Sequence, residues 1–133
     1  MTGLLETMRV VTAAGGVPRV PLLELHLARM ADSARALGMS LPRPDELRVR
    51  VAAFVEELRH DAVLRLAVRI SSGEPSIECR LRELRAPDAI LRLLLVPSPA
   101  YAPSPIHKLL DRTHWNRLEE RARAAARDET LLV

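Results

Sequence analysis

Short apolar stretches with the patterns of β-strands occur at four places in the chain. The segments 63–71 and 76–84 carry an apolar side chain at every second position, which is the period that one face of a sheet requires. The segment 4–12 also predicts a strand, and 89–96 is apolar almost throughout, which is typical of a central strand. We therefore expect about four strands in one sheet.

After the first of these strands the apolar period lengthens to three and four residues, which predicts an amphipathic helix from Leu22. Gly38 provides a natural end for this helix. Its apolar stripe consists of Leu23, Leu27, Met30, Ala34 and Leu37. His26, Arg29 and Ser33 lie off the stripe at spacings of three and four, so they line up on another side of the same helix.

A second helix is predicted from Pro44 to about Arg59. Proline is favoured in a first turn, and Asp45 and Glu46 there complement the positive end of the helix dipole. The expected buried stripe contains Leu47, Val51, Phe54 or Val55, and Leu58. Together these elements predict an α+β fold for residues 1–96, with a small antiparallel sheet of about four strands and two helices packed on one face.

A proline-rich stretch, 97–106, separates this small N-terminal domain from the rest of the chain. Its four prolines within nine residues predict an extended interdomain linker. Residues 107–133 then predict one helix and one apolar terminal strand, which together are too short to bury a core of their own. They either dock on the first domain or form the start of an incomplete second domain.

The composition is that of an ordinary globular protein, with 48% hydrophobic and 28% charged residues, so wholesale disorder is not expected. Phe54, Tyr101 and Trp115 are the only aromatic residues, which argues against folds that stack nucleic-acid bases on aromatic side chains. The formal net charge is +3 and no run of five like charges occurs, so we expect no nucleic-acid partner.

A single cysteine, Cys79, excludes an internal disulfide, and its inward position on a strand predicts a core thiol rather than a nucleophile. No apolar run approaches the roughly 20 residues that cross a bilayer, and the first residues, with Glu6 and Arg9, lack the pattern of a signal peptide. A cytoplasmic protein without membrane contact is therefore expected. Glu6 and Arg9 share one strand, where we expect a structural ion pair.

Lys108 is the only lysine, because the other 19 of the 20 basic residues are arginines. A guanidinium stays protonated, whereas a lysine amine can lose its proton and attack a carbonyl group. Lys108 lies just after the proline-rich stretch, with His107 before it. From composition alone, an ordinary solvated lysine at a helix start is the simpler interpretation.

The N-terminal residues LLETMRV are followed by a glycine turn and by LLELHLARMADSARALG, and the C-terminal residues are HKLLDRTHWNRLEERARAAARDETLLV. Together they resemble the fold-type IV family of pyridoxal-phosphate enzymes, which contains the class IV aminotransferases and 4-amino-4-deoxychorismate lyase. That family typically shows an E-T-x-R-like strand, an H-L-x-R-L helix, and a lysine about twenty residues before a D-E-x-L-L strand. Lys108 and Asp128 are twenty residues apart. The resemblance covers nearly the whole chain, but only the amino-terminal part of a family member.

The resemblance implies that Lys108 is the catalytic lysine, joined as a Schiff base to the cofactor pyridoxal 5'-phosphate. It also implies that Arg29, in the H-L-x-R motif, binds the cofactor phosphate, and that the small-molecule substrate is an amino acid or an amino-chorismate. No metal site is expected, and His26 is expected to cap or pack. His107 either modulates the pKa of Lys108 or has no role. Lyase and aminotransferase chemistry both stay open.

In that family, the carboxylate that pairs with the pyridine nitrogen and the loops around the phosphate follow the D-E-x-L-L strand, which is where this sequence ends. We therefore expect these 133 residues not to hold the cofactor or turn over substrate by themselves. A truncated product, half of a split enzyme and a degenerate relative all stay open. The apolar terminal strand favours a homodimer or a complementary C-terminal half as partner. The alternative function is a non-catalytic α+β interaction domain.

Overall fold

The computed structural model describes residues 2–70, 74–86, 90–97 and 107–132. By their contacts the residues divide into two units. Unit 1 contains Met1–Leu84 together with His107–Leu110, and unit 2 contains Arg85–Ile106 and Asp111–Val133. Most of the predicted linker, residues 98–106, lies outside the described residues.

The sheet of unit 1 has three antiparallel strands, which are β1 (Thr2–Val10), β2 (Ala62–Ile70) and β3 (Ser76–Glu83). β2 is the central strand and pairs with both of the others. Within this register every second side chain of a strand lies on the same face of the sheet. The alternating pattern of the sequence therefore predicted which residues face the helices.

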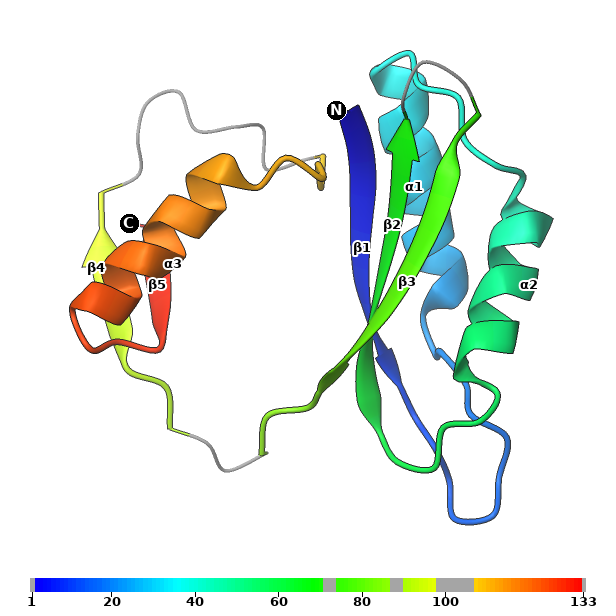
Figure 1. The fold of residues 1–133 in the computed structure, drawn as a ribbon, viewed down its shortest axis with the longest axis horizontal. Helices are drawn as coiled ribbons and strands as arrows, with labels where there is room; N and C mark the ends of the chain where they lie inside the picture. The colour runs from blue at the N-terminus through cyan, green and yellow to red at the C-terminus, as the bar shows by residue number, and fades with distance from the viewer. Residues whose placement is uncertain (1, 71–73, 87–89, 98–106, 133) are drawn as a thin grey trace. The chain divides into compact units, whose positions relative to one another are not determined.

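Two helices, α1 (Leu23–Ala36) and α2 (Pro44–Val55), cover one face of this sheet (Figure 1). α1 ends where the sequence predicts, because Gly38 adopts a positive φ of 64° that glycine accepts without strain. α2 begins with Pro44, and acidic residues occupy its first turn. The predicted α+β class, with two helices on one face of a small antiparallel sheet, is confirmed.

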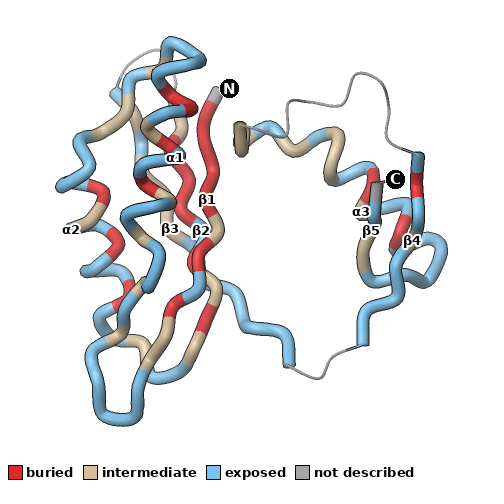
Figure 2. The backbone as a smooth tube through the Cα atoms, turned by 180° about the vertical axis from the view of Figure 1, so that it is seen from behind, coloured by how far each residue is buried: buried red, intermediate tan, exposed pale blue. Residues whose placement is uncertain are grey.

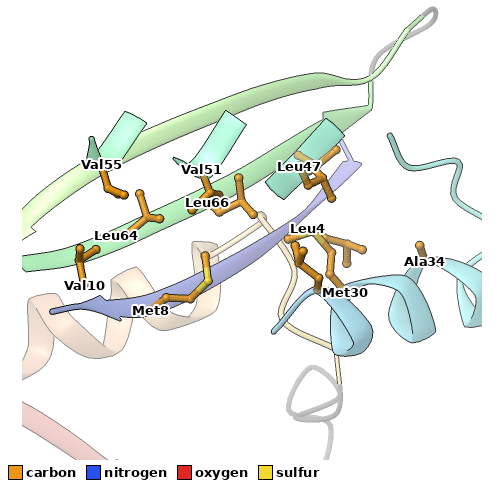
Figure 3. Packing of buried hydrophobic residues seen from close by; sticks show 12 residues of the cluster. Leu4, Met8, Val10, Met30, Ala34, Leu47, Val51, Val55, Leu64 and Leu66 are labelled. Atoms are coloured by element: carbon orange, nitrogen blue, oxygen red, sulfur yellow. The ribbon is translucent and has the colours of Figure 1, made fainter. Parts of the chain in front are cut away.

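The core of unit 1 lies between the sheet and the two helices, and the buried positions follow β1 and β2 (Figure 2, Figure 3). It consists of Leu4, Met8, Val10, Leu27, Met30, Ala34, Leu47, Val51, Val55, Leu64, Leu66 and Val68. Val55 rather than Phe54 completes the stripe of α2, since Phe54 is 40% exposed. Each large apolar side chain buried here stabilises the fold by roughly 1.5–3 kcal/mol.

The outer edge of β1 is capped by the segment His107–Leu110. The Leu5 N–H donates to the Lys108 carbonyl at 2.8 Å, and the Leu110 N–H donates to the Gly3 carbonyl at 2.9 Å. These bonds satisfy backbone groups that an open strand edge would leave unpaired. The capping segment therefore belongs to unit 1, although residues of unit 2 precede and follow it in the sequence.

The prediction that 89–96 is a central strand of this sheet is wrong. The strand found there, β4 (Leu93–Val96), pairs in parallel with β5 (Glu129–Leu132) in a separate two-stranded sheet. Beside β1, the place of a fourth strand is taken by the capping segment, whose Leu109 forms an antiparallel bridge with Leu4. An apolar run indicates a buried strand but does not say which strand will pair with it.

Unit 2 is built from β4, β5 and the helix α3 (Thr113–Ala124). The Thr130 hydroxyl on β5 donates to the carbonyl of Leu118 on α3 at 2.9 Å. The Arg92 N–H donates to the Asp128 carboxylate at 2.8 Å, and the Asp128 N–H donates back to the Arg92 carbonyl at the same distance. This reciprocal pair aligns the starts of the two parallel strands.

We predict that Gly3→Ala lowers the free energy of unfolding by about 2 kcal/mol. A Cβ there would lie 2.5 Å from the Val68 carbonyl oxygen and 3.0 Å from Leu110 Cδ2, so β2 or the capping segment has to shift. Urea unfolding measures the cost, and amide hydrogen exchange at Leu110 shows whether the segment is released. Gly16→Ala is the control, since its Cβ meets only Ala13 in an exposed turn. Equal stability of both variants would contradict this packing.

Candidate functional site

A buried carboxylate lies at the centre of the candidate site. Glu6 is only 2% exposed, although it lies on β1 among core side chains. Arg29 binds it side-on, with Nε donating to Oε1 at 2.8 Å and Nη2 donating to Oε2. His26 Nδ1 lies 2.8 Å from the same Oε2. Both oxygens of Glu6 are thus hydrogen-bonded, as a buried charge requires.

Arg29 is oriented by this contact but remains half exposed, at 50%. Within the described residues its hydrogen bonds to Glu6 use Nε and Nη2, which leaves the Nη1 side of the guanidinium facing away from Glu6. The Glu6 carboxylate raises the pKa of Arg29, although burial opposes the effect. A fixed, permanently charged guanidinium of this kind suits a phosphate or a carboxylate.

The three polar residues that the sequence aligns along α1 have partners on β1 and on the capping segment. His26 and Arg29 both bind Glu6. Ser33, one turn further along, is 5% exposed, and its Oγ lies 3.1 Å from Nδ1 of His107. The periodicity predicted that these side chains share one side of the helix, whereas their partners come from segments far away in the sequence.

The expected ion pair between Glu6 and Arg9 is not formed. Arg9 pairs instead with Asp61 at 2.8 Å, and Glu6 points toward α1. Residues three apart on a strand point to opposite faces of a sheet, so their side chains cannot meet. The Thr12 N–H and the Arg9 guanidinium hold the pKa of Asp61 below its usual value.

Lys108 is held at the same edge of β1. Its carbonyl accepts the Leu5 N–H, and the residue is partly buried. Leu109 bridges Leu4 and packs against the core, so the alternation of an extended segment directs the Lys108 side chain to the other face of the sheet. Lys108 and Arg29, the two predicted cofactor-binding residues, are thus anchored to neighbouring residues of one strand.

The face of the sheet away from the helices carries a cavity of about 70 Å³. It is lined by Arg65, Ala67, Arg69, Glu78, Arg80 and Leu110. Arg65 and Arg80 lie directly opposite each other in the register of β2 and β3. Glu78 pairs with Arg69 at 2.9 Å and with Arg80, and both guanidiniums hold its pKa below the usual value. Three guanidiniums against one carboxylate favour an anionic ligand.

Sequence reasoning did not single out these cavity arginines. The signal that could have found them is their period of two, since Arg65 and Arg69 share one face of β2 and Arg80 follows on the next strand. Only the pairing of β2 with β3 brings them to the same cavity.

A comparison with protein families decides which family this is. The family model described as amino-transferase class IV matches residues 3–133. The chain belongs to the class IV aminotransferase family.

Solved structures of the same fold come from two kinds of protein. The branched-chain aminotransferase from Thermoproteus uzoniensis is 18% identical, with a TM-score of 0.76; the match covers 99% of this chain and 50% of that one. A protein from Legionella pneumophila, with a proposed activity of 4-amino-4-deoxychorismate lyase, is 18% identical with a TM-score of 0.73; the match covers 98% and 52%.

A third structure contains a cofactor derivative. It is a branched-chain amino acid aminotransferase from the organism abbreviated T.th., in complex with N-(5'-phosphopyridoxyl)-L-glutamate. It is 21% identical, with a TM-score of 0.73, and the match covers 99% of this chain and 49% of that one. The present chain thus spans about half the length of these solved relatives. Among curated protein sequences no match is found.

Other chemistry in this class IV aminotransferase chain has less support. Cys79 is partly buried against the core, and burial raises the pKa of its thiol, which disfavours the nucleophilic thiolate. Within the described ranges no three His, Cys, Asp or Glu residues gather as metal ligands. No helix in the described part of the chain is both long and apolar enough to cross a membrane.

We predict that Arg29→Met costs more stability than Glu6→Gln. Without Arg29 the buried Glu6 carboxylate keeps only His26, which costs about 3 kcal/mol. A glutamine at position 6 can still accept from Arg29 and donate to His26, which limits the cost to about 1 kcal/mol. Urea unfolding of both variants measures the difference.

The matched control is the double variant Glu6→Gln/Arg29→Met, which should cost less than the two single changes together because no buried charge is left unpaired. Equal costs of the two single changes, or strict additivity in the double variant, would mean that Glu6 is not held in place by Arg29.

Proposed function

We propose that this chain is the amino-terminal part of a pyridoxal-phosphate-dependent enzyme, of aminotransferase or aminodeoxychorismate-lyase type. In this proposal Lys108 bonds the cofactor aldehyde and Arg29 binds its phosphate. The observation that carries it is that Lys108 binds Leu5 and Arg29 binds Glu6, two consecutive residues of β1. Membership of the class IV family and the phosphopyridoxyl complex of the third solved relative support the assignment.

The residues at this edge of β1 fit the chemistry of that cofactor. When bound, pyridoxal phosphate supplies an aldehyde that condenses with amines and a ring that withdraws electrons from the substrate α-carbon. Lys108 carries the only side-chain amine of the sequence, and its nitrogen can also take and return the proton of that α-carbon. Arg29, oriented by Glu6, offers a phosphate the free side of a charged guanidinium.

The arginine-lined cavity supports an amino substrate that carries a carboxylate. Leu110 lines this cavity, and the alternation of the capping segment puts Lys108 on the same face of the sheet. Arg65 and Arg80 can therefore hold a carboxylate on the face where the lysine amine lies. Amino acids and amino-chorismates both carry this group, so the cavity fits either reaction.

Complete turnover is part of the same proposal and involves more than these residues. The chain spans about half of its solved relatives, which supports a complementary C-terminal segment or a partner chain that completes the site. A homodimer is the other assembly that fits the sequence.

We predict that pyridoxal phosphate, trapped with cyanoborohydride, labels Lys108 in preference to the α-amine of the chain. In an unstructured chain the lower pKa of the α-amine favours labelling there, so preference for Lys108 requires the folded site. Mass spectrometry of the reduced peptides gives the ratio of the two adducts within one molecule. Since Lys108 is the only lysine, no other side chain competes.

Three controls sharpen this measurement. Lys108→Arg keeps the charge and should leave the α-amine as the only labelled group. Pyridoxal, which lacks the phosphate, should show a smaller preference for Lys108, and Arg29→Met should reduce the preference for pyridoxal phosphate to the level of pyridoxal. A wild-type chain that labels its α-amine first, folded as well as in urea, would disprove the proposed function.

A further inference from the structure

Among the described residues two polar side chains are buried, Glu6 and Ser33, and each holds one end of the candidate site. Glu6 binds the Arg29 guanidinium, and Ser33 binds the ring of His107, the residue before Lys108. Burying a hydroxyl costs free energy unless it is hydrogen-bonded, so the Ser33 contact contributes to the local structure.

These contacts form a closed circuit. Lys108 binds Leu5 through the backbone, Leu5 is bonded to Glu6, and Glu6 holds Arg29 on α1. One helical turn after Arg29, about 6 Å along the axis, the same side of α1 carries Ser33. Ser33 then binds His107, which is bonded to Lys108.

The hydrogen bond between Ser33 and His107 is the one link of this circuit that joins α1 directly to the lysine-bearing segment. The backbone bonds of Lys108 and Leu110 fix the segment to β1, but they leave its position relative to α1 undefined. Only the contact with Ser33 sets the segment against the helix that carries Arg29.

We propose that Ser33 and His107 are positioning residues that set Lys108 at a defined distance from Arg29. The inference rests on the proposed function and deepens it. A rigid cofactor held by its phosphate presents its aldehyde at one place, and productive geometry tolerates errors of only about 0.5 Å. His107 acts through a neutral hydrogen bond to a buried hydroxyl and does not itself contact the cofactor.

The test uses a matched pair of variants at position 107 together with Ser33→Ala. His107→Leu keeps a similar shape without polar atoms, whereas His107→Asn places an amide atom where Nδ1 lies. Each chain is labelled with pyridoxal phosphate or with pyridoxal under cyanoborohydride, and the ratio of the Lys108 adduct to the α-amine adduct is measured. Urea unfolding confirms that each variant is folded.

With pyridoxal phosphate we expect Ser33→Ala and His107→Leu to lower the adduct ratio about fivefold, the effect of losing one hydrogen bond. With pyridoxal, which has no phosphate for Arg29 to hold, the ratio should stay that of the wild type. His107→Asn should restore the wild-type ratio. If Ser33→Ala does not fold, the pair at position 107 decides.

Wild-type ratios in Ser33→Ala and His107→Leu would overturn the positioning role while leaving the proposed function intact. Equal losses with both reagents would show a general structural role instead, and failure of His107→Asn to restore the ratio would show that the hydrogen bond is not what matters. A wild-type chain with no preference for pyridoxal phosphate over pyridoxal at Lys108 would overturn the proposed function and this inference together.

Discussion

The pairing of His107–Leu110 with the edge of β1 is the contact on which the candidate site depends. Two backbone hydrogen bonds and the packing of Leu109 bring this segment into unit 1, although the residues on either side of it belong to unit 2. The same contact protects an open strand edge, which is a common site of unwanted association. Protection of the edge and placement of Lys108 therefore have one physical cause.

The buried Glu6 carboxylate is the second constraint, because it places a charge among core side chains. Such a charge is tolerated only with close partners, and Arg29 and His26 supply them from α1. The cost of desolvating Glu6 thus serves to hold Arg29 in one orientation, with half of its surface still open to solvent. Stability and the proposed phosphate contact are coupled through the same ion pair.

The two faces of the sheet have different compositions, and the period of two along each strand separates them. The face toward the helices is apolar apart from Glu6 and forms the core (Figure 3). The other face carries the arginine-lined cavity and, by alternation, the side chain of Lys108. A shift of the register by one residue would exchange the faces, so the packing that stabilises unit 1 also selects which arginines line the cavity.

The sequence by itself determined the local structure: the strands of unit 1, both of its helices, the end of α1 at Gly38, the core positions, and the alignment of His26, Arg29 and Ser33. These follow from periodicity and from residues such as proline and glycine whose effect acts within a few positions. The predicted cofactor roles of Lys108 and Arg29 came from resemblance and stay predictions. Only the tertiary structure decided that β4 leaves the first sheet, that Glu6 pairs with Arg29 rather than Arg9, and that Ser33 meets His107. The physical reason is that strand pairing and buried polar contacts join residues far apart in the sequence, where many apolar or charged partners are locally equivalent and only the packing of the whole unit distinguishes them.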